Sequence, residues 1–143
     1  MPKMHLPDIN VWLALTFDSH LHHPAAKTWF DALGNDALCF FCRLTQQGFL
    51  RLATNPSVFG KDAVTLPDAW QKYAVFLSDP RVAFAGEPAG LETQWRTFTQ
   101  TQSFSPKVWN DAYLAAFAQT GGLEMVTFDK AFTQYSITCT ILS

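Results

Sequence analysis

Apolar and polar positions follow one another along the chain in blocks that predict alternating strands and helices. Short apolar runs predict buried strands at 4–6, 37–41, 81–85 and 124–128, and an edge strand at 137–142. Runs with apolar residues at helical spacing predict helices at 11–17, 25–33, 43–54, 66–77, 91–99 and 107–120, with a short turn at 130–132. The polar segment 57–65 is expected to be a loop.

Residues that cap or break helices support these boundaries. Asp8 is placed to cap the first helix, and Asn55-Pro56 ends the third. Gly121-Gly122 is a typical helix C-cap. Alternating strands and helices indicate an α/β fold in three layers, with a central, mostly parallel sheet of four to five strands flanked by helices. Without repeats or linkers, residues 1–143 are expected to form a single domain.

The composition narrows the class of protein. Apolar residues make up 48% of the chain and charged residues 15%, which suits a buried core. The net charge of −2 does not favour binding of nucleic acid through bulk positive charge, so RNA or DNA would need a local patch, a metal or a partner. An odd number of cysteines without a secretory leader indicates the cytoplasm, and no apolar run is long enough to cross a membrane.

Three acids stand where a catalytic site is expected. Asp8 and Asp129 each follow a strand-like run, and Asp111 lies near the start of a helix. If the first and fourth strands are neighbours, these carboxylates meet at one edge of the sheet, where open α/β sheets bind ligands. Their mutual repulsion would be relieved by a divalent cation, and oxygen-only ligands suit Mg²⁺ or Mn²⁺. The alternative is that each acid is a helix cap or a surface charge.

Two lysines, three histidines and two cysteines can each be interpreted as functional or as purely structural residues. Lys107 and Lys130 flank the acids and form either a local basic rim or two solvated charges. The histidines at 20, 22 and 23 lack a cysteine or acid at zinc-ligand spacing. Cys39 and Cys42 have the spacing of a CxxC motif, but two phenylalanines between them favour a buried strand.

Four segments together resemble the PIN-domain ribonucleases, in particular the VapC toxins of bacterial toxin–antitoxin pairs. They are LPDINVWLA at 6–14, RLTQQGFLR at 43–51, NDAYLA at 110–115 and VTFD at 126–129. Their order and spacing match that family over nearly the full length. The resemblance implies a metal-dependent endoribonuclease of PIN-like fold that uses Mg²⁺ or Mn²⁺.

The resemblance also implies roles for particular residues. Asp8, Asp111 and Asp129 would be catalytic and would hold the metal. Thr127 and Asn10 would orient the site, and Arg51 could contact phosphate or be a plain surface arginine. Gln46 stands where the family commonly has a Glu; its neutral carbonyl oxygen can ligate or orient water but adds no charge. Glu87 and Glu92 are possible substitutes for that Glu.

Expected partners follow from the same resemblance. They are an RNA substrate (a tRNA or a ribosomal RNA loop), a VapB-type antitoxin and a second copy of the chain in a homodimer, with DNA bound only through the antitoxin. A different class of function stays open: a catalytically weakened PIN-like module that lacks the usual Glu and binds RNA or protein without cutting.

Overall fold

The computed structural model describes residues 3–143 and contains one five-stranded sheet with the order β3-β2-β1-β4-β5. The strands are β1 (Met4–Pro7), β2 (Leu38–Phe41), β3 (Val82–Phe84), β4 (Glu124–Thr127) and β5 (Cys139–Ile141). Every pairing of neighbours in this sheet is parallel. The predicted α/β fold, with its parallel sheet flanked by helices, is therefore confirmed.

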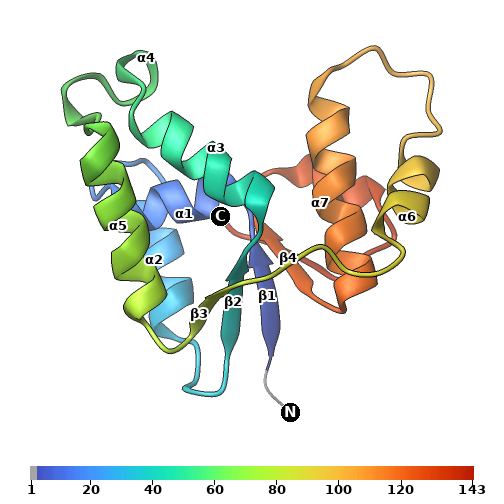
Figure 1. Ribbon diagram of the computed structural model, residues 1–143, viewed down its shortest axis with the longest axis horizontal. Coiled ribbons are helices and arrows are strands. Elements are labelled where there is room, and N and C mark those ends of the chain that lie inside the picture. The colour runs from blue at the N-terminus through green and yellow to red at the C-terminus, as the bar shows by residue number, and fades with distance from the viewer. Residues whose placement is uncertain (1–2) are drawn as a thin grey trace.

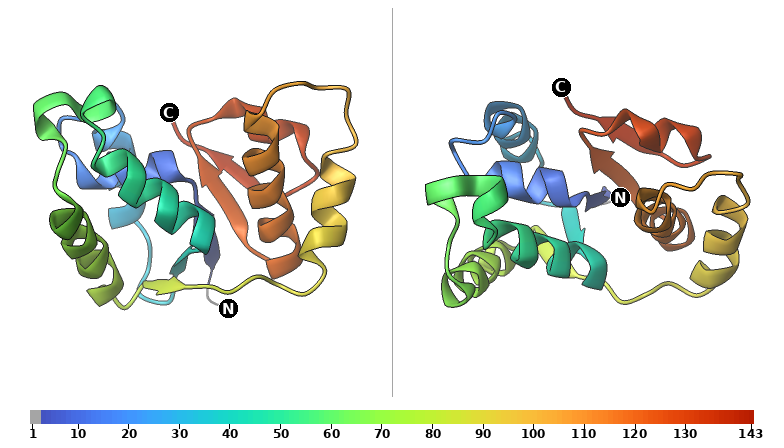
Figure 2. Two further views of the ribbon diagram at one scale, coloured as in Figure 1. Left: turned by 45° about the horizontal axis from the view of Figure 1, so that its top comes forward. Right: turned by 90° about the horizontal axis from the view of Figure 1, so that it is seen from above.

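Helices connect the strands and cover the sheet (Figure 1). They are α1 (Ile9–Thr16), α2 (His23–Asp31), α3 (Arg43–Ala53), α4 (Pro56–Phe59), α5 (Leu66–Ser78), α6 (Leu91–Phe98) and α7 (Lys107–Gly121). Two 3₁₀ turns, η1 (Gly60–Asp62) and η2 (Lys130–Gln134), complete the elements. Helices α1, α2, α3 and α5 pack in one buried cluster and α6 and α7 in another, and the view from above in Figure 2 shows these two groups of helices apart from each other.

One predicted boundary is wrong. The segment 57–65 is not simply a polar loop, because its first residues form α4 and η1. Pro56 occupies the first turn of α4, and the side chain of Asn55 accepts a hydrogen bond from the Ser57 amide at 2.9 Å. Proline at the first turn and asparagine at the cap are both favourable helix-start residues. The stacking of Phe59 on Phe17, with ring centroids 4.1 Å apart, then holds this short helix against the core.

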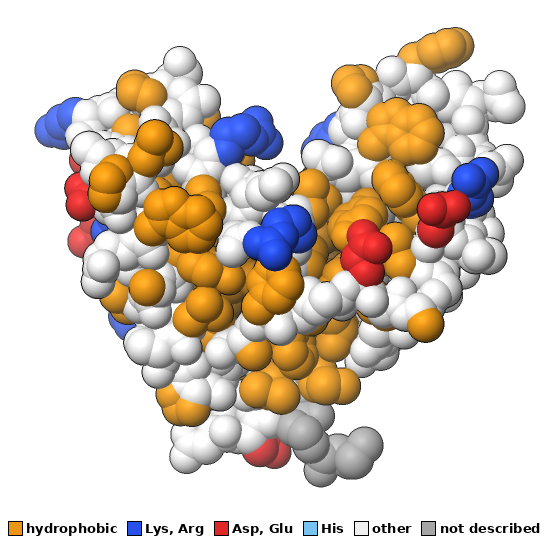
Figure 3. Space-filling model, in the orientation of Figure 1, with side chains coloured by type: hydrophobic (Ala, Val, Ile, Leu, Met, Phe, Trp, Pro, Cys, Tyr) orange, Lys and Arg blue, Asp and Glu red, His pale blue; other side chains and the backbone are white. Residues whose placement is uncertain are grey.

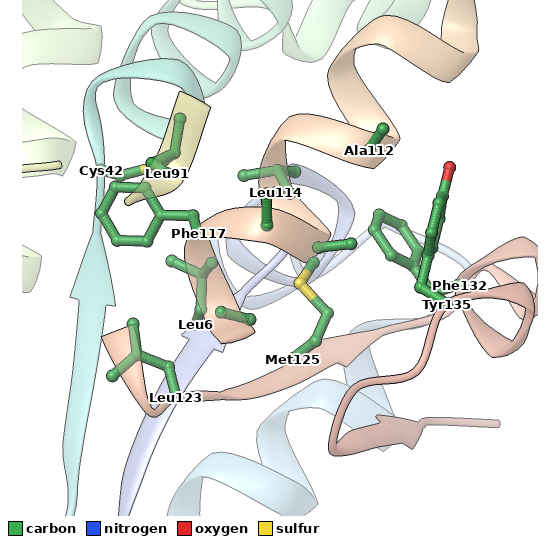
Figure 4. Close-up of a cluster of buried hydrophobic side chains, with 13 residues drawn as sticks. Leu6, Cys42, Leu91, Ala112, Leu114, Phe117, Leu123, Met125, Phe132 and Tyr135 are labelled. Atoms are coloured by element: carbon green, nitrogen blue, oxygen red, sulfur yellow. The ribbon is translucent and has the colours of Figure 1, made fainter. Parts of the chain in front are cut away.

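Two groups of buried side chains form the core. In one, α7 packs on β1 and β4 through apolar residues that include Leu6, Phe117 and Met125 (Figure 4). In the other, α1, α3 and α5 pack around Trp12 and Phe41, whose rings stack with centroids 3.9 Å apart. Large aromatic side chains thus fill the space under short helices.

The fold leaves a notch between its two halves. Figure 3 shows a V-shaped outline in which the part built on α3 and α5 stands apart from the part built on α6 and α7. The arrowheads of β1 and β4 in Figure 1 point toward this notch. Because β1 and β4 are paired, with Pro7 opposite Val126, the residues that follow them emerge side by side. Within residues 3–143, no helix combines the length and hydropathy that a membrane span needs.

Candidate active site

Asp8 joins the end of β1 to the start of α1. It is the N-cap of α1, and its Oδ1 accepts a hydrogen bond from the Ile9 amide at 2.7 Å. Its Oδ2 accepts a hydrogen bond from the Thr127 hydroxyl at 2.8 Å. Asp8 is therefore a helix cap, as one reading proposed, and it also reaches across to the end of β4.

Thr127 is the hydrogen-bonding centre of this edge of the sheet. Its buried hydroxyl donates to Asp8 and accepts from the Asp129 amide at 3.0 Å and from Asn10 Nδ2 at 3.4 Å. These bonds hold the two strand ends in a fixed relation. The Oδ1 atom of Asn10 is buried and finds no donor within residues 3–143, which leaves an unused oxygen beside Asp8.

Asp111 and Asp129 are joined by the ammonium group of Lys107. Lys107 Nζ donates to Asp111 Oδ2 at 2.7 Å, one helical turn away on α7, and also to Asp129 Oδ2. Asp129 additionally caps η2, since its Oδ1 accepts from the Ala131 amide at 2.9 Å. The three predicted acids therefore come together at one edge of the sheet, Asp8 and Asp129 through Thr127, and Asp111 through Lys107.

The charges at this edge are unevenly balanced. Burial raises the pKa of Asp8 to about 6, and repulsion from Asp111 and Asp129 adds to that rise, while the Thr127 hydrogen bond opposes it. The hydrogen bond from Lys107 instead lowers the pKa of Asp129. Burial tends to lower the pKa of Lys107, but its two bonds to aspartate outweigh this and raise that pKa overall. Within residues 3–143, Asp8 is thus the one of these three acids that has no positively charged partner.

The residues at this edge fit a hard divalent cation. Asp111 and Asp129 already share one positive group, Asp8 is desolvated without one, and the Asn10 oxygen is unused. All of these donors are oxygen atoms, which Mg²⁺ and Mn²⁺ prefer. As the side chains stand in the described part of the chain, no group of three or more His, Cys, Asp or Glu is close enough to hold a metal ion. The acids would therefore have to draw together around one.

Two other predicted residues lie outside this hydrogen-bond network. Gln46 is buried on α3, and its Oε1 accepts a hydrogen bond from Arg43. Arg51 is exposed near the end of α3. Across residues 3–143, no hydrogen bond or ion pair joins either side chain to the three acids.

The possible substitutes for the missing Glu are also engaged elsewhere. Glu87 accepts a hydrogen bond from the Tyr113 hydroxyl at 2.7 Å. Glu92 forms an exposed ion pair with Arg96 on α6. Neither carboxylate is hydrogen-bonded to the acidic edge in the described residues.

The structure also accounts for the histidines and cysteines. His22 stacks on Phe128, and His23 Nδ1 lies 2.7 Å from the Ala14 carbonyl oxygen. Cys39 and Cys42 are buried and free. These groups have structural surroundings and contribute no metal site in the part of the chain that the structure describes.

Sequence reasoning missed two features of the site. The bridge made by Lys107 had a partial signal, because Lys107 and Asp111 are four residues apart on one helix. Tyr135 had none: its hydroxyl is buried without a partner in residues 3–143 and points toward the turn of α7 that carries Ala112 (Figure 4). Burial raises the pKa of Tyr135, and the charge of Asp111 adds to this.

Comparison with known proteins agrees with this geometry. A model of the PIN domain matches residues 6–137. Ribonuclease VapC41 of Mycobacterium tuberculosis is 54% identical over 136 residues, which span 92% of this chain and 93% of that protein. Such identity over nearly the full length of both proteins shows a shared family.

Solved structures of low sequence identity have the same fold. VapBC2 from Rickettsia felis, bound to a DNA fragment from their promoter, gives a TM-score of 0.70 at 13% identity over 98% of this chain and 99% of that one. The sarcin-ricin loop cleaving toxin VapC20 of M. tuberculosis gives 0.67 at 20% identity over 94% and 96%. Together with the full-length match in sequence, these likenesses place the chain in the PIN-domain family, among the VapC ribonucleases.

Proposed function

We propose that this protein is a metal-dependent endoribonuclease and the toxin of a type II toxin–antitoxin pair. The observation that carries the proposal is the meeting of Asp8, Asp111 and Asp129 at the carboxyl edge of β1 and β4. Partly buried carboxylates at such an edge repel one another, and a bound cation removes that repulsion. The 54% identity to Ribonuclease VapC41 supports RNA as the substrate.

The three aspartates would hold Mg²⁺ or Mn²⁺. Such an ion, when bound, supplies Lewis acidity that polarises a water molecule and a phosphate oxygen. Thr127 holds Asp8 in place through its hydroxyl, and its bond to the Asp129 amide fixes the end of β4. Asn10 offers its unused Oδ1 to a water molecule or a substrate hydroxyl at the same edge.

Residues beside the notch would guide the substrate. Arg51 projects from α3 into solvent and can pair with a phosphate of RNA. Gln46, held by Arg43, is proposed to orient water through its amide rather than to bind the metal directly. The open notch in Figure 3 gives a single-stranded or looped RNA access to the strand ends.

A second candidate function rests on Gln46. Its carbonyl oxygen is occupied by Arg43, and it contributes no negative charge to the site. A PIN-like module with weakened metal binding could bind RNA or protein without cutting it. This candidate predicts a folded protein that retains RNA but leaves it intact with either metal.

The substrate is proposed to be a structured RNA loop, in a tRNA or a ribosomal RNA. The likeness in fold to VapC20, a sarcin-ricin loop cleaving toxin, supports the ribosomal choice. A notch of this kind suits bases that are splayed out of a helix more than a regular duplex. The chain carries a net charge of −2, so recognition would depend on local arginines and lysines and on the metal.

The proposed partners are a VapB-type antitoxin and a second copy of the chain in a homodimer, acting in the cytoplasm. Exposed apolar side chains are available for such contacts: Leu66, Trp70 and Leu77 on α5, Phe104, and Trp109 on α7. DNA would be bound only through the antitoxin. The VapBC2 complex bound to promoter DNA supports this arrangement.

The test is cleavage of total cellular RNA by the purified chain with Mg²⁺, with Mn²⁺ and with EDTA, beside an Asp111→Asn variant. We expect discrete fragments that require both the metal and Asp111, with at least about a hundredfold loss in the variant. Asp18→Asn, an exposed aspartate outside the site, is the matched control and should cleave normally. If the folded wild-type chain leaves the RNA intact with either metal, the proposal of a nuclease is wrong and the second candidate, a module that binds without cutting, is favoured.

A further inference from the structure

Lys107 occupies the position that a metal shared by Asp111 and Asp129 would need. Its ammonium group binds Oδ2 of both carboxylates. The other oxygen of Asp129 is engaged by the Ala131 amide, so Oδ2 is the oxygen left for a cation. A metal that binds Asp129 Oδ2 would therefore have to compete with the Lys107 ammonium group for that oxygen.

Lys107 is also able to leave this position. Its side chain is 58% exposed, whereas those of Asp111 and Asp129 are 14% and 30% exposed. It stands on the first turn of α7, after the segment 99–106 that connects α6 to α7 (Figure 1). An exposed lysine stem can swing into water at small cost, because the ammonium group is readily hydrated.

We propose that Lys107 is a built-in competitor of the catalytic metal: it joins Asp111 to Asp129 in the metal-free protein and gives way when the ion binds. This inference rests on the proposed metal site. It assigns Lys107 as a positioning residue, which keeps the two carboxylates together until the ion arrives and weakens the apparent affinity for that ion. Because both cations bind one pair of carboxylates, removing the lysine must favour the metal.

The experiment is a calorimetric titration of the purified chain with Mn²⁺ alone, in the absence of RNA. We expect Lys107→Met to bind Mn²⁺ at least about fivefold more tightly than wild type. Lys107→Arg, whose guanidinium can join the same two carboxylates, should stay near the wild-type affinity. Lys130→Met is the matched control, since it removes an exposed charge next to Asp129 that forms no ion pair in the described residues; it should change the affinity less than twofold.

A second readout does not involve the metal. In EDTA, Lys107→Met should melt at a lower temperature than wild type, because Asp111 and Asp129 are left facing each other without a cation. An unchanged or weaker Mn²⁺ affinity in Lys107→Met would overturn the inference, as would an equal gain in Lys130→Met or an unchanged melting temperature in EDTA.

The same titration separates this inference from the proposed function. Wild-type binding of Mn²⁺ that is lost in Asp111→Asn supports the metal site, whatever Lys107→Met does. Binding by Lys107→Met but not by wild type would support the competition strongly. Absence of binding in both would remove the metal site and the competition together.

Discussion

At Asp8, one carboxylate serves both the fold and the site. It caps α1 through the Ile9 amide and binds the Thr127 hydroxyl through its other oxygen. Its pKa of about 6 reflects burial and two neighbouring acids, and no lysine pairs with it in the described part of the chain. A cation that draws Asp8, Asp111 and Asp129 together would therefore relieve an unfavourable charge that folding alone creates.

The pH dependence of stability should reveal this cost. The unfolded chain releases the Asp8 proton near pH 3.8 and the folded chain near 6, so between these values the folded state holds more protons. Stability must then fall as pH rises through that window, by up to about 3 kcal/mol. In EDTA, Asp8→Asn should gain melting temperature relative to wild type between pH 4 and pH 7. A difference in melting temperature that stays constant over this range would contradict the assignment.

Thr127 should control the same ionisation. Thr127→Val keeps the shape of the side chain but removes the hydroxyl that bonds Asp8 and accepts from the Asp129 amide. A hydrogen bond to a charged group contributes about 1.5–3 kcal/mol, so the pKa of Asp8 should rise by about one unit or more. The acidic limb of the cleavage-rate profile should shift to higher pH, and Thr127→Ser should restore it. If Thr127→Val lowers the cleavage rate at every pH but does not shift the acidic limb, the Thr127 hydroxyl does not control the ionisation of Asp8.

At the scale of elements, α3 packs closely against the first residue of α1, directly beside Asp8. A Cβ atom added to Gly48 of α3 would lie 2.2 Å from Ile9 Cδ1 and 2.9 Å from Ile9 Cγ1. Ile9 is the first residue of α1 and follows Asp8 directly. A side chain larger than that of glycine at position 48 would therefore force the Ile9 side chain to move, in the same segment that holds Gln46.

A double-mutant cycle tests this contact. Gly48→Ala alone should destabilise the protein by about 1–2 kcal/mol, because the new methyl group forces Ile9 from its place. In an Ile9→Ala background the same change should be neutral or stabilising, since alanine is favoured over glycine in a helix by about 1 kcal/mol. Equal effects in the two backgrounds, measured by urea unfolding, would rule out the clash.

Pattern and spacing predict most of these elements, and the places where they fail have tertiary causes. The apolar runs and caps located the strands, α7 and the three acids, because burial at strand ends follows from local sequence. The helix α4 was missed because Asn55-Pro56, which begins it, was interpreted only as the end of the preceding helix, and because Phe59 of α4 stacks on Phe17, far away in the sequence. The Lys107–Asp129 contact spans 22 residues and depends on the packing of α7 against β4, so spacing could indicate only the contact of Lys107 with Asp111.

At the scale of the whole molecule, the notch would bring the acidic edge of the sheet and the proposed RNA substrate together. The sheet order places β1 and β4 side by side, so that Asp8 and Asp129, far apart in the sequence, lie at the same edge of the sheet. The two halves on either side supply Arg51 from α3 and Lys107 from α7. A chain with a net charge of −2 can in this way offer local positive groups to RNA beside an acidic site.

The measurement that tests the central claim most directly is the chemistry of the ends that cleavage leaves on RNA. If water attacks phosphorus and the bond to the 3′ oxygen breaks, the fragments carry a 5′-phosphate and a 3′-hydroxyl. We predict these ends with Mg²⁺ or Mn²⁺ and none of the fragments in EDTA or with Asp111→Asn. Fragments with a 5′-hydroxyl and a cyclic phosphate, formed equally in EDTA, would contradict hydrolysis at the acidic site.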